Sequence, residues 1–153
     1  MRIKNYYDAD VAAVARGSIM VILKVHGTID TPDKMIFTRA DYTRARNDCA
    51  GFYSVLEALS ITHSFLFIGC GLNDPDMKLM LEDHAFIHKF SEPHYFVTAK
   101  GTIPSSIIPA IERNLNIKMI EYSGGHAQLK PELEALVATV TQARTNMQIS
   151  ASW

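Results

Sequence analysis

Hydrophobic residues along this chain gather in short continuous runs, and segments with helical spacing lie between the runs. Each run has the length of a strand and is rich in β-branched or aromatic residues. The runs cover residues 19–25, 64–68, 94–98 and 116–122. Continuous apolar runs are typical of parallel strands that are buried on both faces. We therefore predict a parallel strand at each run, and we expect 19–25 to be a central strand of the sheet.

The segments between the strands repeat their apolar residues every three or four positions, as amphipathic helices do. They cover residues 8–16, 38–61 with Gly51 dividing two helices, 75–88, 107–115 and 129–140. Asp74 is a favourable N-cap, and Pro75 fits the first helical position after it. Strands that alternate with helices predict an α/β fold with a Rossmann-like, mostly parallel sheet and helices on both faces. We treat 1–148 as one domain and expect 149–153 to be a frayed tail.

The composition is that of a globular protein that buries its own core, with 153 residues, 48% of them hydrophobic and 20% charged. Its 15 basic and 16 acidic residues form no long run of either sign, which argues against direct binding to nucleic acid or to an anionic membrane. No apolar run approaches the ~20 residues of a membrane-spanning helix, and the N-terminus shows no apolar signal region. We therefore expect a cytoplasmic protein.

Metal and disulfide chemistry has little support in the sequence. The two cysteines, Cys49 and Cys70, belong to no Cys-x-x-Cys pair, so we expect neither a disulfide framework nor a zinc site. We interpret Cys70 as a small buried residue. His84 and His88 have the i, i+4 spacing of a metal-binding pair, but no glutamate follows His84 and no third ligand is evident. We interpret this pair as the margin of a helix contact.

The first candidate site follows the strand 19–25. Open α/β sheets bind ligands outside the carboxyl ends of their strands, and His26 stands there. A histidine can titrate near neutrality and take a proton from a sugar hydroxyl or from water, while Gly27 permits close approach of a ligand. The alternative is a histidine that satisfies a buried backbone group at a turn. The residues alone leave both interpretations open.

The second candidate site follows the strand 64–68. It reads Gly69-Cys70-Gly71-Leu72 and leads into the next helix. The third glycine of a dinucleotide fingerprint is missing because Asp74 stands there, and its carboxylate fits ribose hydroxyls better than phosphate. The alternative is a tight turn with a good helix cap. Further along the chain, His126 either caps the terminal helix or lines a ligand loop.

Two motifs resemble the sirtuin-like domains of bacterial defence proteins. Lys-Val-His-Gly-Thr-Ile-Asp at 24–30 is similar to their Lys-Leu-His-Gly-Ser-Ile-Asp, and 35–42 is similar to the stretch after it, which ends in Asp-Tyr. The segment 67–76, Phe-Ile-Gly-Cys-Gly-Leu-Asn-Asp-Pro-Asp, resembles their later motif Phe-Ile-Gly-Tyr-Ser-Leu-x-Asp-Pro-Asp. The resemblance extends over roughly residues 18–140.

The resemblance implies a Rossmann-like domain that consumes NAD as its substrate. It implies that His26 is the catalytic histidine and acts on the nicotinamide ribose. The residues expected to contact NAD are Gly27, Gly69, Cys70, Gly71, Leu72 and His126. The family's zinc-module cysteines are absent and a helical segment at 42–61 stands in their place, which favours an NAD hydrolase over a lysine deacylase.

The resemblance covers only the C-terminal half of the family's domain. In the family, a phosphate-binding Gly-Ala-Gly loop and a catalytic asparagine precede the histidine by a long stretch, whereas 25 residues precede His26. We therefore expect an incomplete sirtuin-like fold that needs an upstream half or another protein chain to be active, and an oligomer. The alternative is a non-catalytic interaction or regulatory module, and an NAD-dependent protein deacylase is the weaker one.

Overall fold

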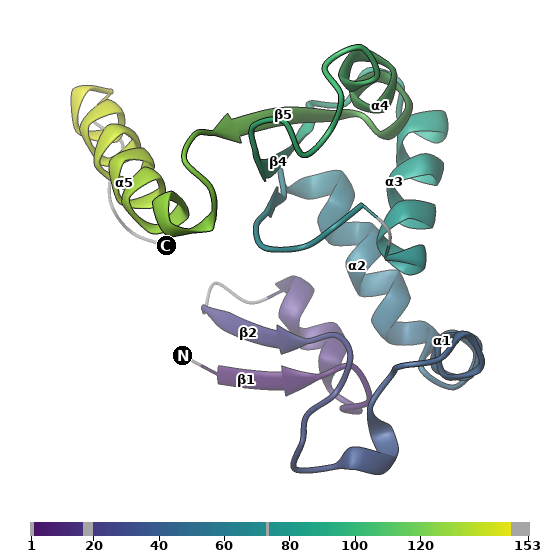
Figure 1. Cartoon of the computed structure of the whole chain (residues 1–153). Coiled ribbons are helices and arrows are strands. Elements are labelled where there is room, and N and C mark those ends of the chain that lie inside the picture. Colours follow the sequence, from purple (N-terminus) through teal and green to yellow (C-terminus); the bar gives the residue numbers. More distant parts are fainter. Residues whose placement is uncertain (1, 17–19, 73, 148–153) are drawn as a thin grey trace. The chain divides into compact units, whose positions relative to one another are not determined.

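The computed structural model describes residues 2–16, 20–72 and 74–147. The chain divides into two compact units, which we call unit 1 (Met1–His63) and unit 2 (Ser64–Ser152). Figure 1 shows unit 1 in purple to blue and unit 2 in teal to yellow. The expectation of a single domain over 1–148 stays a prediction, and the frayed tail expected at 149–153 lies outside the described residues.

Unit 1 contains a two-stranded parallel sheet and helical segments. Its elements are β1 (Arg2–Asn5), the 3-10 helix η1 (Val11–Arg16), β2 (Val21–Lys24), the 3-10 helix η2 (Pro32–Lys34), α1 (Arg39–Asp48) and α2 (Ala50–Thr62). The two strands point the same way in Figure 1, and Ile3 lies opposite Ile22 in their register. The strand β1 was not expected from the sequence, because Ile3 is its one apolar residue and it forms no apolar run.

Three expectations for unit 1 are corrected by the structure. The break expected at Gly51 lies at Cys49, which ends α1 and precedes α2, so Gly51 is inside α2. The helix expected over 8–16 is the shorter 3-10 helix η1, whose start is set by hydrogen bonds from Val11 N to Asp8 O and from Ala13 N to Asp10 O. The strand expected over 19–25 is β2, and its residue 19 lies outside the described residues. It is not a central strand buried on both faces. Among the described residues it pairs with β1 alone, and Ile22 is 42% exposed.

The core of unit 1 forms where η1, α1 and α2 bring apolar side chains together behind the strands. Its buried members are Tyr6, Val11, Ile36, Ala45 and Phe52. The rings of Tyr6 and Phe52 meet edge to face at 6.1 Å, a favoured geometry for aromatic pairs. Tyr6 follows β1 directly, so this core ties the end of the sheet to the helices.

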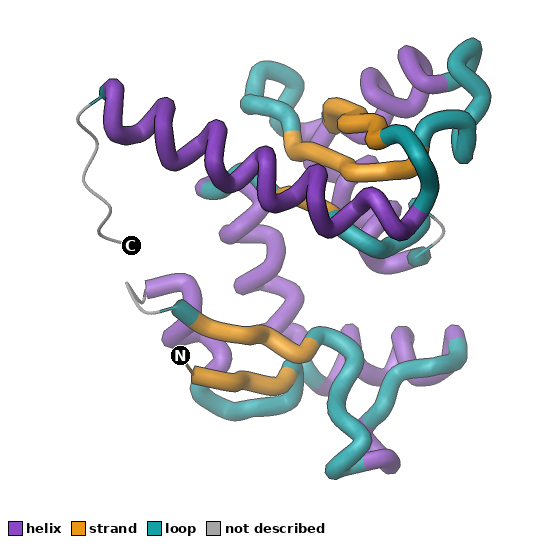
Figure 2. The backbone as a smooth tube through the Cα atoms, turned by 60° about the vertical axis from the view of Figure 1, so that its left-hand side comes forward, coloured by secondary structure: helices purple, strands orange, loops and turns teal. Residues whose placement is uncertain are grey.

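Unit 2 contains three parallel strands in the order β3-β4-β5. Its elements are β3 (Leu66–Phe67), α3 (Pro75–Ile87), β4 (His94–Ala99), α4 (Ile108–Leu115), β5 (Ile117–Tyr122), the 3-10 helix η3 (His126–Gln128) and α5 (Leu129–Asn146). A helix stands between each strand and the next, and Figure 2 shows the strands in orange. The expected strand at 64–68 is thus found, but only two of its residues pair with β4.

The core of unit 2 lies between its sheet and the helices α3 and α4. Its buried members are Leu81, Phe96, Leu115 and Ile117. Leu81 and Ile117 are 0% and 1% exposed, so this core is closed to solvent. The terminal helix α5 is less covered, because Val137 and Val140 on its expected apolar face remain exposed.

Parallel strands flanked by helices confirm the mixed α/β, Rossmann-like class expected from the sequence. The carboxyl ends of parallel strands meet at one edge of a sheet, which is where such folds place their ligands. In unit 1 this edge leads into His26, and in unit 2 it leads into the turn at 69–72 and the loop at 123–125. No helix within the described part of the chain is long and apolar enough to span a membrane.

Candidate functional site

His26 follows Val25, the residue directly after β2, and its side chain is half-buried. Its carbonyl oxygen accepts a hydrogen bond from Ile36 N at 3.1 Å, so the backbone at the histidine is held by a segment ten positions along the chain. The ring of Tyr42 meets the imidazole edge to face, with 5.4 Å between the ring centroids and 84° between the ring planes. The histidine is therefore constrained at its backbone and at its ring.

The loop after His26 is closed by two tyrosines that follow β1. Tyr6 donates its hydroxyl to Lys34 O at 2.9 Å, and the hydroxyl of Tyr7 lies 2.7 Å from Thr31 Oγ1. The Lys34 ammonium also sits 4.5 Å from the centre of the Tyr7 ring, within the range of a cation–π contact. These contacts within unit 1 fix the shape of the loop next to the histidine.

Gly27 has a structural reason to be a glycine. Its φ is +85°, which side chains disfavour, and a Cβ placed there would lie 2.7 Å from Lys34 O. The close approach is therefore between two parts of the same loop. A contact between Gly27 and NAD, expected from the resemblance, stays a prediction.

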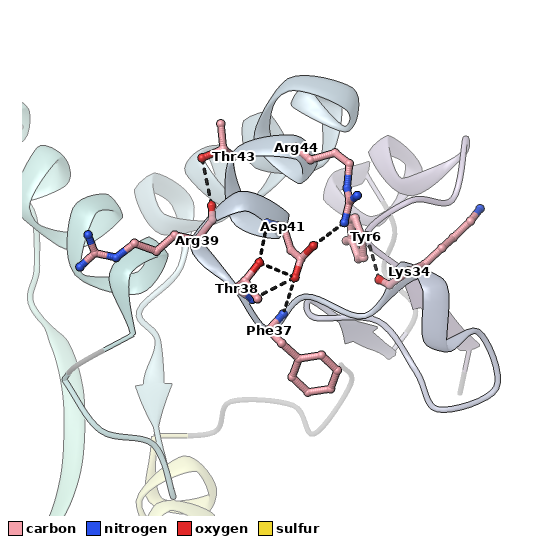
Figure 3. Close-up of polar contacts among 8 residues, drawn as sticks. All are labelled: Tyr6, Lys34, Phe37, Thr38, Arg39, Asp41, Thr43 and Arg44. Carbon is pink, nitrogen blue, oxygen red and sulfur yellow. Dashed lines mark hydrogen bonds and ion pairs between the residues drawn. The ribbon is translucent and has the colours of Figure 1, made fainter.

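A capping box fixes the start of α1 behind the loop (Figure 3). Thr38 Oγ1 accepts from Asp41 N at 3.2 Å, while the Asp41 carboxylate accepts from the N–H groups of Thr38 at 2.9 Å and Phe37 at 3.3 Å. Arg44 pairs with the same carboxylate. The hydrogen bonds from Thr38, then the one from Phe37 and the charge of Arg44, hold the pKa of Asp41 below its usual value.

The second predicted segment lies on the surface of unit 2, after β3. Gly69 has a φ of +69°, and a Cβ placed there would meet no atom of the described surroundings within 4 Å. Both Cys70 and Gly71 are exposed. The expectation of a buried Cys70 is wrong, because β3 ends after two residues and the turn leaves the core there. Partial shielding of its sulfur still raises the pKa of the Cys70 thiol, which disfavours the reactive thiolate.

The end of this segment returns to the core and begins α3. Leu72 is half-buried and packs against the core of unit 2. Asp74 Oδ1 accepts from Met77 N at 3.0 Å, which is the N-cap expected from the sequence. The carboxylate is thus engaged as a cap at the start of α3. Contacts of Gly69, Cys70, Gly71 and Leu72 with NAD stay predictions.

His126 stands in the loop after β5, at the start of η3. Its Nδ1 lies 3.1 Å from the hydroxyl of Tyr122, the last residue of that strand. The side chain also lines an open groove of ≈ 490 Å³ along the first turns of α5. The other lining residues are Leu129, Lys130, Leu133, Glu134 and Val137. His126 is therefore at the carboxyl edge of the sheet in unit 2, as the turn at 69–72 is.

His84 in α3 and His88, which directly follows that helix, are part of a polar cluster that the sequence did not predict. The ring centroids of His84 and His88 lie 5.0 Å apart, as i, i+4 spacing requires, and His84 lies 5.1 Å from His94. His84 Nε2 is 2.9 Å from Ser91 Oγ, which donates to His88 O and accepts from Asn116 Nδ2. The hydroxyl of Ser91 is thereby saturated and serves structure.

Metal ligation has no support in the described segments, where no group of three or more histidine, cysteine, aspartate or glutamate side chains could hold an ion. The expectation that the chain holds no zinc stays a prediction. Tyr42 is the residue that sequence reasoning missed at the candidate site. The pattern Thr38-x-x-Asp41 is a capping-box signature and could have located the start of the helix that carries it.

Comparison with known proteins adds a family and two relatives. The family model of the SIR2-like domain matches residues 3–120. The chain is 32% identical over 99 residues to the NAD(+) hydrolase ThsA of Enterococcus faecium, which covers 63% of this chain and 20% of that protein. It is 28% identical over 78 residues to the NAD(+) hydrolase ThsA of Acinetobacter baumannii (strain 532279), covering 51% and 16%. The matches thus span a fifth or less of the length of these curated relatives.

Proposed function

Because the chain belongs to the SIR2-like domain family, we propose that it is part of a bacterial defence protein that hydrolyses NAD+, and that His26 is its catalytic histidine. The relatives named above are NAD(+) hydrolases, and this activity is proposed here for the assembly that contains the chain. We also propose that an upstream half or another protein chain completes the active protein. The complete protein is proposed to be a cytoplasmic oligomer.

The placement of His26 is the observation that carries the proposal. It combines a position at the carboxyl end of a parallel strand with a half-buried ring and a backbone fixed by Ile36. A catalytic base must reach its substrate from a rigid element, and these contacts meet that need. Gly27, the turn 69–72 and His126 are the proposed contacts with NAD.

The chemistry of the reaction needs one base. Water forms a bond to C1′ of the nicotinamide ribose while the bond from C1′ to the pyridinium nitrogen breaks. The electron pair of that bond leaves with nicotinamide, which becomes neutral, so the leaving group requires no proton. The proton lost by the water is the one that His26 takes, directly or through a ribose hydroxyl. The products are ADP-ribose, nicotinamide and a proton.

The helices α1 and α2 support hydrolysis over lysine deacylation. They occupy 39–62, the region in which the classical deacylases of the resemblance carry two Cys-x-x-Cys pairs, and this chain has two cysteines in all. The region is instead packed around Ala45 and Phe52, which belong to the core of unit 1. This packing supports the proposal that the region is held by its own apolar core instead of by a zinc module.

A non-catalytic interaction module is the second candidate. Its support is the uncovered apolar surface of unit 1, where Ile3 and Ile22 lie opposite each other in the sheet and are 56% and 42% exposed. Exposed apolar patches mark surfaces that another protein covers. This surface is compatible with an enzyme that needs a second part, so catalysis is what separates the two candidates.

The test is nicotinamide release from NAD+ by three preparations, namely this chain, the proposed completing part (an upstream half or another protein chain), and the two together. We expect release only from the combined preparation, with ADP-ribose as the other product. The completing part alone is the control for activity that does not need this chain. Equal release with and without this chain would support the interaction module. Release that requires an acylated lysine peptide would support the deacylase.

A further inference from the structure

The ring of Tyr42 is the aromatic side chain that contacts His26 at the candidate site. The two rings meet at 5.4 Å and 84°, the edge-to-face arrangement that restricts how each can rotate. Tyr42 is half-buried and also packs against the core of unit 1. It therefore links the imidazole to the rigid interior of the unit.

The capping box determines where Tyr42 lies. Tyr42 is the first residue whose N–H bonds within the helical turn, donating to Thr38 O at 3.1 Å. The Asp41 carboxylate, one position before it, binds the backbone of Thr38 and Phe37 and pairs with Arg44. In Figure 3 these contacts converge on Asp41, and the ring of Phe37 turns away from them. The turn that carries Tyr42 is thus held by contacts of Asp41 with the residues before it, Phe37 and Thr38, and with Arg44 after it.

The same segment also holds His26 through its backbone. Ile36, two residues before the cap, is buried in the core and donates its N–H to His26 O. The chain between Ile36 and Tyr42 is consequently a brace whose one end binds the backbone of His26 and whose other end contacts its ring. The closed loop anchored by Tyr6 leads directly into this brace.

We propose that Tyr42 is a positioning residue that holds the imidazole of His26 in one orientation for proton transfer. This inference rests on the proposed role of His26 in NAD cleavage, but the orientation itself can be measured in this chain without substrate. A base that rotates away from its productive geometry spends less time ready to react, so we expect loss of the ring to lower kcat about tenfold with KM nearly unchanged.

The first experiment compares three variants of this chain by histidine side-chain NMR at a fixed pH. Tyr42→Phe retains the ring, Tyr42→Leu removes it, and Tyr53→Leu is the matched control. Tyr53 is half-buried against the same core, but its ring meets Phe52 at 5.1 Å. The imidazole signals of His26 are identified by their loss in His26→Ala. Backbone spectra report whether each variant is folded.

We expect the order of the His26 ring to fall in Tyr42→Leu, because the ring contact that limits its rotation is lost. Tyr42→Phe and Tyr53→Leu should keep the wild-type pattern. Wild-type order of the His26 ring in Tyr42→Leu would overturn the proposal. If Tyr42→Leu does not fold, Asp41→Ala loosens the brace with the ring retained, and an unchanged His26 in that variant overturns it equally.

The second experiment measures NAD cleavage by the same variants in the combined preparation described above. A tenfold loss of kcat in Tyr42→Leu that Tyr42→Phe restores, and that Tyr53→Leu does not show, supports the positioning role. If His26 loses its order while cleavage is unaffected, the positioning stands and the proposed catalytic role of His26 fails. If His26 keeps its order and cleavage still falls, the positioning fails and the catalytic role stands.

Discussion

His26 in unit 1 and His94 in unit 2 show how differently two histidines next to parallel strands are used. His26 follows the carboxyl end of β2, is half-buried, and contacts Tyr42 at the rim of a closed loop. His94 begins β4 at its amino end and is 1% exposed. Its ring stacks on the ring of Phe65 with 5.1 Å between the centroids, and its Nδ1 accepts a hydrogen bond from Phe65 N at 3.1 Å.

The difference shows which features distinguish a structural histidine from one that is placed for catalysis. Nδ1 of His94 must be unprotonated to accept a backbone N–H, so the ring is fixed as a neutral acceptor inside the core. Burial lowers the pKa of His94, and the nearby His84 lowers it further, which also favours the neutral form. His26 stands at the carboxyl end of a strand, where parallel sheets bind ligands, while His94 stands at the amino end of a strand in the separate sheet of unit 2.

The largest expected effect is on catalysis, from His26→Ala in the combined preparation. Loss of a general base should lower nicotinamide release by roughly 10²- to 10⁴-fold. The free energy of unfolding of the chain should change by less than about 1 kcal/mol, because the side chain is half-buried. Activity and thermal melting are to be measured on one preparation.

His63→Ala is the matched control for that variant. His63 is exposed at the end of α2, and its Nδ1 contacts only the neighbouring Thr62 hydroxyl among the hydrogen bonds of the described residues. It should retain wild-type release. A His26→Ala protein with a lowered melting temperature and wild-type nicotinamide release per folded molecule would show that His26 is a structural residue. The contrast between His26 and His94 would then be wrong.

The next largest effect is on stability, from His94→Ala. The variant leaves a cavity in the core beside Phe65 and deprives Phe65 N of its acceptor, which together should cost about 2–4 kcal/mol. Urea unfolding followed by circular dichroism measures it. His88→Ala, which truncates a half-buried ring in the same cluster, should cost less than about 1 kcal/mol. Equal losses in the two variants would contradict the assignment of His94 as the buried anchor.

Much of this architecture is predictable from sequence, because periodicity reports which residues face a core. The strand expected at 94–98 is β4, the helix expected at 107–115 is α4 with one residue fewer, and the cap at Asp74 is present. The position of His26 after a strand followed from the same reasoning. Each of these features depends on residues close together in the chain.

The features that escaped prediction depend on tertiary contacts. The contact between Tyr42 and His26 joins residues far apart in the chain, and it exists only because the segment from Ile36 returns past the strand. The burial of His94 is equally hidden, since a polar residue at the start of a strand gives no sign of a core position. Cys70 was misjudged because the interpretation relied on the lack of a cationic residue near it in the sequence, whereas the turn that carries it leaves the core and exposes it.

A smaller effect on stability is expected from alanine at two glycines, one in each candidate segment, and it compares how closely the two segments are packed. Gly27 and Gly69 both have positive φ, so alanine at either site should cost about 1–2 kcal/mol from backbone strain. Gly27→Ala adds a clash with Lys34 O, whereas a Cβ at Gly69 meets open space. We therefore expect Gly27→Ala to be the more destabilising variant in urea unfolding. The reverse order would contradict the close packing of the loop after His26.

The smallest expected effect is a difference in how the two units respond to acid. Burial lowers the pKa of His84 and His94 below 6.5, so the folded chain binds these protons less tightly than the unfolded chain. Their contribution to stability is complete above 6.5 and falls as the pH drops through that value. The lowered pKa of Asp41 acts in a different pH range, because the contribution of Asp41 to stability is present above pH 3.8 and is lost only at still lower pH.

Between pH 6.5 and pH 3.8, amide exchange protection should therefore fall in β4 and β5 before it falls in the first turn of α1. His94→Asn keeps an acceptor near Phe65 N without a titrating ring and should reduce the loss in unit 2. Protection that falls first in α1 would show that the buried histidines do not govern the acid response.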